Sequence, residues 1–600
     1  MKKIFLIIIS AIALVGCTIE EKVFSNSKPS TYYQTVPQCI TGLNGCYIPL
    51  KNIYANADYF EVCEAAADLI YYKSQSWYDA CGNYTQAQPR FGSTIWTQGY
   101  LGVMRCNAMY AALERAVAKK YITEEEADPL FAECVILRAF YYYILTINFG
   151  DVPYYFEEVT DANNDRITQL PRMSAEELRY ILMEELEDWL LKKQALPFVK
   201  TYDASNDYRI GSMVGLTIAG KLALWNKRFD LAIKFYAPIE AVYGTGAYKT
   251  DSQTGETLYS PEDALMSYPL TDVMFRNRYT PESIFEIPAY AKDYGFKVTQ
   301  SLASRCMPSR KTNTTEGGSD DDALEDESVD LSIRSDIYDG ISIPELGADA
   351  RVTAQYKPTP YFYQSASFTD YQKNTVSKGL MPYNSNDKRR SVYDATKVGT
   401  GEIVEVEGGG GWLAWCYKGR RVNEVDNKVD MSQDPDLHFF AKLKNVATGE
   451  PHLGDKFWCP GMVYTQDSNN LKVFRFAHIL LDLAEANMRV GNWDKAASYY
   501  AATRKRAGLE NDAAAITDHE LFMDLLQKES ARELFGEYTR RHNLVRWGKW
   551  QDHIAKYAPY DIFRQNVAEG PCREYYPIPD VQVVLSNYNL DNKEYDKYGL

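Results

Sequence analysis

Six histidines are the first residues to consider for chemistry, because imidazole serves both as a general base and as a metal ligand. None lies in an HExxH motif, and none has a cysteine at a metal-binding spacing. GxSxG, a Walker loop and GxGxxG are also absent from the sequence. Four glycines at 408–411 lead into Trp412 and not into Lys-Ser/Thr, which argues against a phosphate-binding loop. We therefore expect no catalytic residue, no metal and no cofactor.

Carboxylates are the second group with possible chemistry. The chain has 81 acidic residues, and a pair could hydrolyse a glycosidic bond, because such acids meet in space and not in sequence. No pair stands out by pattern, so a glycan hydrolase stays open as an alternative. The acidic run from Asp320 to Asp330 offers oxygen ligands for calcium, but it lacks the spacing and turn glycine of an EF-hand. A solvated acidic loop is the favoured interpretation.

Aromatic residues on loops are the third group. Tyrosines outnumber phenylalanines 47 to 24, and tyrosine combines an apolar ring with a polar end that suits recognition surfaces. Exposed rings can stack on sugar rings while neighbouring polar groups bond the hydroxyls. One pair follows an expected helix over 59–71, one follows a strand-like segment over 283–288, and one follows the glycine run. For each ring alone, packing onto the protein is the favoured interpretation, but we expect at least one ring of the group to face ligand. The predicted ligand-binding residues are Trp77, Tyr78, Tyr290, Tyr294, Trp412 and Trp415.

Helices must position these loops, and the first half of the chain has helical patterns. Apolar residues recur at three- and four-residue spacing over 100–118. The capping box 123–126 predicts the start of a second helix that ends at Gly150. Ser174 predicts a third helix with the same capping, ending near Gln194.

Two later segments resemble each other. Residues 227–236 and 491–500 each place an aromatic residue in a tight turn after an apolar helix, followed by an alanine and, four residues further on, a tyrosine. Both are similar to the G-x-Y-x-x-A turn of a tetratricopeptide repeat. Two unrelated helical hairpins are the alternative interpretation.

The middle of the chain differs from both ends. Between 250 and 460 helical periodicity fades, Gly, Pro, Ser and Thr gather, and short strands such as 403–406 are expected. We predict a mainly α fold, with a tetratricopeptide-like helical-hairpin scaffold and a large irregular insertion of loops and short strands. The expected parts are 17–250, an insertion over 251–470 that binds ligand, and 471–600.

The net charge restricts the kinds of partner that the protein can bind, and the cysteine content bears on whether it has disulfides. The net charge of −16 disfavours nucleic acid, whose binding depends on basic clusters. Eleven cysteines permit disulfides, with Cys39/Cys46 and Cys63/Cys81 as the pairs nearest in sequence. Buried, unpaired cysteines are the favoured alternative.

The N-terminus has the pattern of an export signal. Two lysines precede a short apolar run that closes as Leu14-Val15-Gly16-Cys17. The run is too short to cross a bilayer, which needs about 20 apolar residues. Its end resembles the bacterial lipobox, so we expect residues 1–16 to be removed and Cys17 to be acylated. The protein would then be attached to a membrane by its lipid.

Several blocks in a fixed order resemble the SusD/RagB family of outer-membrane nutrient-binding lipoproteins. The helix that contains Arg138 leads into Phe-Gly-Asp-Val-Pro at 149–153, and the chain closes with Tyr-Pro-Ile-Pro at 576–579. The other matching positions are Trp96, Tyr100, Asn107, 475–486, 504–508, 529–533 and 544–549.

This resemblance implies a non-enzymatic protein that captures oligosaccharides and delivers them, as a lid, to a SusC-like TonB-dependent transporter. A peptide-binding relative is the alternative within the family. Arg138 and Trp547 would then hold the scaffold and take no part in catalysis. The family blocks assign no ligand residue in the insertion, so the six aromatic residues rest on the sequence pattern alone.

Overall fold

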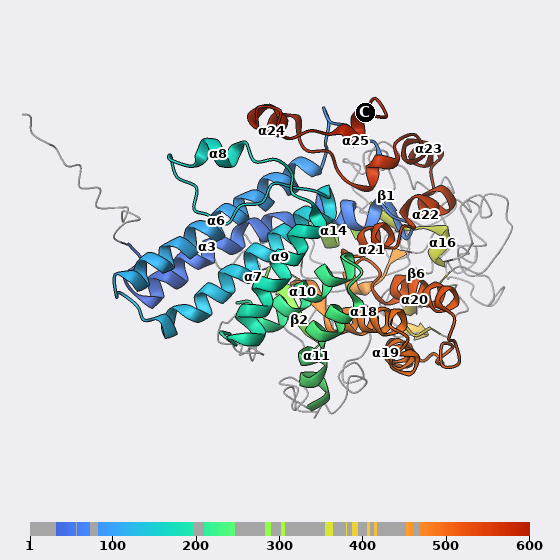
Figure 1. Ribbon diagram of the computed structural model, residues 1–600. Helices are drawn as coiled ribbons and strands as arrows, with labels where there is room; N and C mark the ends of the chain where they lie inside the picture. The colour runs from blue at the N-terminus through green and yellow to red at the C-terminus, as the bar shows by residue number, and fades with distance from the viewer. Residues whose placement is uncertain are drawn as a thin grey trace, which may run out of the picture.

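The computed structural model describes residues 32–55, 57–72, 82–196, 209–245, 282–289, 302–306, 355–363, 387–393, 405–407, 413–416, 452–457 and 469–600, with the single residues 380, 459, 462 and 467. Helices dominate, and the few strands lie among them (Figure 1). The mainly α fold with short inserted strands confirms the predicted fold class.

Three long helices form the N-terminal layer: α3 (Val36–Tyr54), α6 (Gly92–Ala118) and α7 (Glu124–Phe149). Figure 1 shows them side by side in blue and teal. Helices α6 and α7 approach closely at Gly102 of α6, where an added Cβ would stand 2.3 Å from the Tyr141 ring of α7. The Tyr141 hydroxyl donates to the Cys46 carbonyl at 2.5 Å and accepts from the Leu50 N–H at 3.0 Å. One side chain of α7 therefore ties down the middle of α3.

The ends of α7 confirm two predictions. Thr123 and Glu126 form the capping box, with the Glu126 amide donating to the Thr123 hydroxyl at 3.2 Å. Gly150 ends the helix with φ of 70°, a backbone angle that favours glycine. Among the described residues, α7 has the length and apolar composition of a membrane-spanning helix, but its apolar window is entirely buried by other parts of the protein. That burial is typical of a core helix.

The third predicted helix is α9 (Ala175–Glu187), which continues as the π-helix η2 (Asp188–Lys192). The predicted capping by Ser174 is wrong, because its side chain makes no cap hydrogen bond. The Asp151 carboxylate accepts from the Ala175 N–H at 2.8 Å instead. This partner comes from the turn after α7, and the local pattern at 174–177 gave no sign of it.

Two helical hairpins occupy the predicted repeat positions. The first pairs α10 (Ser212–Trp225) with α11 (Phe229–Thr245), and the second pairs α18 (Phe476–Arg489) with α19 (Trp493–Arg506). In the first hairpin Tyr236 fills the space over Gly220, where an added Cβ would lie 2.2 Å from the ring. Asp482 of α18 joins the hairpins, accepting from Lys221 at 2.9 Å and from the Tyr236 hydroxyl at 2.8 Å.

Three small sheets lie beside this scaffold. Strands β1 (Ile70–Tyr72) and β3 (Tyr356–Pro358) pair antiparallel, as do β2 (Ser283–Ile287) and β8 (Leu471–Arg475). A four-stranded sheet has the order β5-β4-β6-β7, with β4 and β6 parallel. Its strands are β4 (Arg390–Tyr393), β5 (Glu405–Glu407), β6 (Leu413–Cys416) and β7 (His452–Leu453).

One sequence prediction near these strands is only half right. The expected helix over 59–71 is α4 (Ala57–Phe60) followed by the π-helix η1 (Glu61–Ala65), and the chain then turns into β1. Strand β1 forms because it pairs with β3. This partner lies almost 290 residues later in the chain, so local periodicity cannot show the pairing. The expected strand 403–406 overlaps β5.

The remaining helices complete the described structure. They are α8 (Asn164–Thr168), α14 (Leu302–Cys306), α16 (Pro360–Tyr363), η7 (Asp455–Phe457), α20 (His519–Glu533), α21 (Arg540–Arg546), α22 (Trp550–Tyr557), α23 (Asp561–Glu569), η8 (Pro571–Glu574), α24 (Asp580–Leu585) and α25 (Lys593–Asp596).

Free and buried thiols are found at Cys39, Cys46, Cys63, Cys106, Cys134 and Cys306, and Cys572 is a free thiol that is partly exposed. Cys39 and Cys46 lie on α3 seven residues apart, which separates them by about 10 Å at 1.5 Å per residue. A disulfide needs Cα atoms within about 7 Å, so the possible Cys39–Cys46 bridge is wrong. Cys63 is buried and free, and Cys81 lies outside the described residues. The interpretation as buried apolar residues holds for these thiols.

Candidate functional site

The predicted site residues fall almost entirely outside the described part of the chain. Trp77, Tyr78, Tyr290, Tyr294 and Trp412 lie there, as does Cys17. Trp415 lies in β6, where its backbone pairs with Val392 of β4. The aromatic binding platform therefore stays a prediction.

The strands that adjoin the predicted aromatic residues are described, and several of them contact one another. Strand β1 ends at Tyr72, just before the segment of Trp77 and Tyr78, and pairs with β3. Strand β3 contacts β7, which pairs with β6, the strand of Trp415. Two of the three predicted aromatic pairs thus belong to segments that adjoin connected strands.

The third pair adjoins β2, whose end is fixed by Asn470. The Asn470 side-chain oxygen accepts from the Ala289 N–H at 3.1 Å, and its amide donates to Glu286 at 2.9 Å. Lys472 forms an ion pair with the same Glu286. The backbone immediately before Tyr290 is therefore held by the buried Asn470, which directly precedes β8.

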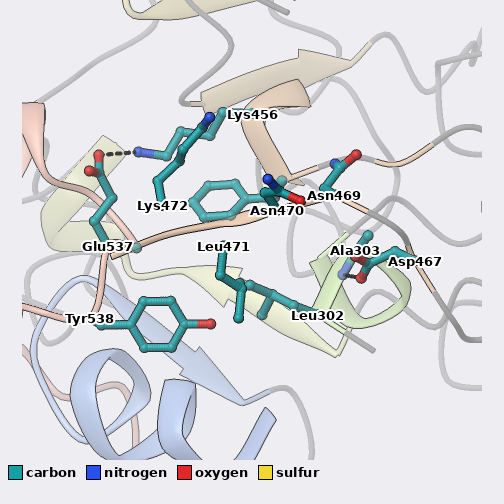
Figure 2. Close-up of a pocket in the computed structure, with 12 residues that line it drawn as sticks. Leu302, Ala303, Lys456, Asp467, Asn469, Asn470, Leu471, Lys472, Glu537 and Tyr538 are labelled. Atoms are coloured by element: carbon teal, nitrogen blue, oxygen red, sulfur yellow. Dashed lines mark hydrogen bonds and ion pairs between the residues drawn. The ribbon is translucent and has the colours of Figure 1, made fainter. Parts of the chain in front are cut away.

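A small pocket lies beside Asn470, where α14, η7, β8 and residues 536–538 meet. Its volume of about 50 Å³ has room for a few ordered waters, because one water needs about 10–15 Å³. Figure 2 shows Glu537 and Tyr538 on one side and Asp467 with Asn469 on the other. Phe457 and Leu471 add apolar surface. The pocket combines apolar and hydrogen-bonding groups, but it is too small to enclose a sugar ring.

Gly536 makes the tight wall of this pocket possible. Its φ is +73°, and an added Cβ would stand 2.4 Å from the Phe457 ring. Any other residue would suffer both backbone strain and a clash at this position. On the opposite side, Asp467 accepts from the Ala303 N–H at 2.9 Å and so fixes the start of α14.

Charge in the pocket is balanced by buried pairs. Lys456 donates to Glu537 at 2.9 Å, and Arg475 donates to both oxygens of Glu537 at 2.7 Å. Burial, together with the nearby Arg475, lowers the pKa of Lys456 to about 8, although Glu537 opposes this. Burial alone would raise the pKa of Glu537, but Arg475 and Lys456 hold it well below its usual value. Glu537 is therefore the anionic centre of the pocket wall.

A buried ionic network extends from Glu537 into the C-terminal scaffold. Arg475 also donates to Glu282 and Glu533 at 2.7 Å each. Glu533 also accepts a hydrogen bond from Arg389 at 3.0 Å, and Arg389 donates to Glu529 at 2.8 Å. The network links the β2–β8 sheet to α20 and to the start of β4. Such pairs position the segments, since breaking one would leave a buried charge without a partner.

A second set of buried acids joins η1 to the insertion and to the C-terminal helices. Glu61 accepts from Arg305 of α14 at 2.9 Å and from the Tyr356 hydroxyl of β3 at 2.7 Å. Two more acids belong to this set. Glu64 accepts from the Thr539 N–H at 2.9 Å, and Asp68 accepts from the Arg540 guanidinium. The Glu61 contacts therefore hold the insertion, and the Glu64 and Asp68 contacts hold the start of α21.

No group of three or more His, Cys, Asp or Glu side chains within the described ranges could hold a metal ion. Arg138 and Trp547 pack in the scaffold, as the family resemblance implied. Arg138 donates to Asn107 at 3.1 Å, and the Trp547 indole donates to Glu485 at 3.0 Å.

The fold defines a class of protein: a scaffold of helical hairpins that supports an insertion of loops and short strands. Comparison with known families then gives a specific result. The profile of the SusD family matches residues 281–595, and the profile described as "Starch-binding associating with outer membrane" matches residues 26–174. The chain belongs to the SusD family.

Individual relatives are distant but cover nearly the whole chain. The SusD-like protein P25 of Formosa agariphila is 21% identical over 591 residues, which is 94% of each protein. A crystal structure of a SusD homolog from Bacteroides thetaiotaomicron has a TM-score of 0.64 at 16% identity, covering 94% of this chain and 98% of that one. Surface glycan-binding protein A from the same organism, solved with laminarihexaose, has a TM-score of 0.58 at 18% identity and covers 94% of this chain and 100% of that one.

Proposed function

We propose that this protein is a surface-exposed, lipid-anchored glycan-binding protein that captures oligosaccharides and delivers them to a SusC-like TonB-dependent transporter of the outer membrane. One observation carries the ligand class: the fold matches, over nearly its whole length, a surface glycan-binding protein that was solved with laminarihexaose. Membership of the SusD family and the outer-membrane wording of the N-terminal profile agree with this proposal.

The ligand would bind to loops of the insertion over 251–470 and to the segment after β1. The described strands support this arrangement, because they connect the segments of Trp77, Tyr78, Trp412 and Trp415 through neighbouring backbones. In this proposal the protein binds without turnover. Buried acids such as Glu61 and Glu537 already serve ion pairs and hold segments in place.

Calorimetry on the mature protein tests the ligand class. Laminarihexaose, other hexasaccharides of different linkage and a panel of peptides would be titrated in turn, with release of reducing ends measured in parallel. We expect saturable binding of at least one glycan and no new reducing ends. Binding of peptides alone would point to the peptide-binding alternative, and turnover by pure protein would show a hydrolase.

Fractionation tests the location. Wild-type protein should sediment with outer membranes and be cleaved by protease added to intact cells. Cys17→Ala protein should lose its membrane attachment and still bind glycan in solution. A Cys17→Ala protein that stays in the membrane fraction would contradict lipid anchoring at this residue.

A further inference from the structure

Three helices of the N-terminal layer each bring a buried cysteine to one place. These are Cys46 of α3, Cys106 of α6 and Cys134 of α7, and each is at most 1% exposed. Figure 1 shows the three helices side by side. The side chains of Cys46 and Cys106 are in hydrogen-bond contact, and Cys134 is near enough to interact electrostatically with Cys46. Thiols that are far apart in the sequence therefore meet inside the helical layer.

The packing of α3 against α6 puts Cys46 and Cys106 opposite each other. The two helices run antiparallel, as shown by the contacts of Gly42 with Met109, Gly45 with Arg105 and Asn52 with Gln98. The second of these pairs directly precedes the two cysteines, so they occupy the same level of the interface. The approach is close, because an added Cβ at Gly42, one turn before Cys46, would stand 3.0 Å from the Met109 sulfur. Helices that pack this closely can bring facing Cβ atoms within the about 3.5–4.5 Å that a disulfide spans.

We propose that Cys46 and Cys106 form a disulfide in the exported protein and so cross-link α3 to α6. The structure describes the reduced pair. In the oxidation each thiol loses its proton, a bond forms between the two Sγ atoms, and two electrons leave the pair. The oxidant is another disulfide, of a protein or a small molecule, which takes up both electrons and both protons and becomes two thiols.

Export supplies this oxidant, since disulfides form in oxidising compartments such as the bacterial periplasm. The inference takes only this location from the proposed function. It goes beyond that function, because it concerns how the first helix of the scaffold is held and not what the protein binds.

Burial determines when the bond can form. The thiolate is the reacting form of cysteine, and burial raises the pKa of the Cys106 thiol well above its usual value. The folded thiols therefore react slowly, and the bond should form as α3 docks on α6, before water is excluded. The bond would close a loop of about 60 residues, and cross-links across long loops stabilise most because they restrict the unfolded chain.

Cys134 is the competing partner for Cys46. The Tyr47 hydroxyl of α3 donates to Glu133 of α7, so Cys134 follows a residue that α3 already contacts. Cys106 is favoured, because its side chain is the one in hydrogen-bond contact with Cys46. A bond to Cys134 is therefore an outcome that the test must separate.

Peptide mapping tests the bond in mature protein isolated from the outer-membrane fraction, with free thiols alkylated first. Trypsin leaves the three cysteines in separate peptides, 23–51, 106–115 and 121–138. We expect 23–51 linked to 106–115, and 121–138 alkylated. Peptide 23–51 also contains Cys39, so Cys46→Ala should abolish the linked pair, and Cys39→Ala on the same helix is the matched control that should keep it. A link to 121–138 would overturn the inference, as would alkylation of all three peptides.

Unfolding gives a second measurement that does not depend on location. Reduced protein would be refolded with oxidised glutathione and unfolded in urea at about pH 5, with and without a phosphine reductant, because thiolates are scarce there and disulfides exchange slowly. The wild type and Cys39→Ala should unfold at a lower urea concentration once reduced, and Cys46→Ala and Cys106→Ala should not respond. A wild type that does not respond would overturn the inference. Absence of the protein from the outer membrane would instead contradict the proposed location, so the two failures are distinguishable.

Discussion

The carboxylate of Glu61 and the guanidinium of Arg305 join the scaffold to the insertion. Their atoms lie 2.9 Å apart, Glu61 is 1% exposed, and Arg305 is 28% exposed. Arg305 lies on α14, which lines the small pocket and contacts β3. A single ion pair thus helps to set where α14 of the insertion lies relative to η1.

Arg305→Met should loosen the insertion more than the scaffold. Hydrogen exchange should rise in 302–306 and 355–363, with a loss of about 1–3 kcal/mol for the charge-assisted bond, while the Tyr356 hydroxyl still donates to Glu61. Arg228→Met is the matched control, because Arg228 and Asp230 form an exposed pair with side chains 41% and 59% exposed. Removing that pair should change the free energy of unfolding by less than about 1 kcal/mol. Equal exchange in both variants would contradict the proposed role of Arg305.

Glu64 should make the protein less stable as the pH rises towards neutrality. Burial raises its pKa to about 7, although the amides of Arg540 and Thr539 oppose this. Because an unfolded glutamate titrates near 4.3, the folded state holds the proton between these two values. Stability conferred by the protonated carboxyl is therefore lost between about pH 4.3 and 7, at up to about 1.4 kcal/mol per pH unit.

Glu64→Gln isolates this contribution from that of other titrating groups. Urea unfolding at several pH values from 5 to 8 should show the stability of the wild type falling relative to the variant as the pH rises. Glu61 has a pKa raised to about 7 mainly by burial, so it acts in the same window and should be replaced in parallel. A constant difference between wild type and variant would show that the Glu64 carboxyl does not titrate in this range.

Gly220→Ala should destabilise the first hairpin. The new methyl group would stand 2.2 Å from the Tyr236 ring, and that ring is fixed by its bond to Asp482. Overpacking of this kind costs about 1–3 kcal/mol. Gly45→Ala on α3 is the control, because an added Cβ there has no atom within 4 Å. It should be neutral or stabilising by up to about 1 kcal/mol, since alanine favours a helix more than glycine does. Chemical unfolding would measure both.

Trp77→Ala and Trp412→Ala should each weaken glycan binding by about tenfold, which corresponds to about 1.4 kcal/mol. The reason is the loss of an apolar ring face on which a sugar stacks. Tyr121→Ala is the control, because Tyr121 is 44% exposed and follows α6 in the scaffold. Calorimetry with a glycan that binds the wild type would measure all three. Unchanged affinity after replacement of all six predicted aromatic residues would show that the platform is wrong.

Local signals predicted the helical scaffold well. The capping box at Thr123, the end of α7 at Gly150 and the two hairpin turns are each specified by residues within a few positions of one another. Non-local partners were missed. Strand β1 depends on β3, and the start of α9 depends on Asp151. Sequence patterns of short range contain no information about such pairings.

The pocket and the ionic network were even harder to predict from the sequence, because their residues come from distant segments. Lys456, Asn470 and Glu537 come from separate segments and form no motif, so no spacing rule could have selected them. Arg475 is surrounded by acids from residues 282, 533 and 537, which meet only after the chain has folded. Arg475 and Glu533 both lie in the family blocks, and this was the available signal for the network. The aromatic residues were selected by composition and loop position, so their use needs measurement.

The antiparallel pair β2–β8 has a consequence for how such a protein can change its ligand. Ile287 lies opposite Leu471, so the insertion begins and ends at one place on the scaffold. The entropy of closing a flexible loop grows slowly, by about 0.6 kcal/mol for each doubling of its length. Loops within this segment can therefore change in length at little cost, provided that Arg305, Arg389 and Lys456 still meet their buried acids on the scaffold. If these loops bind the ligand, as proposed, the ligand can change while the helices stay the same.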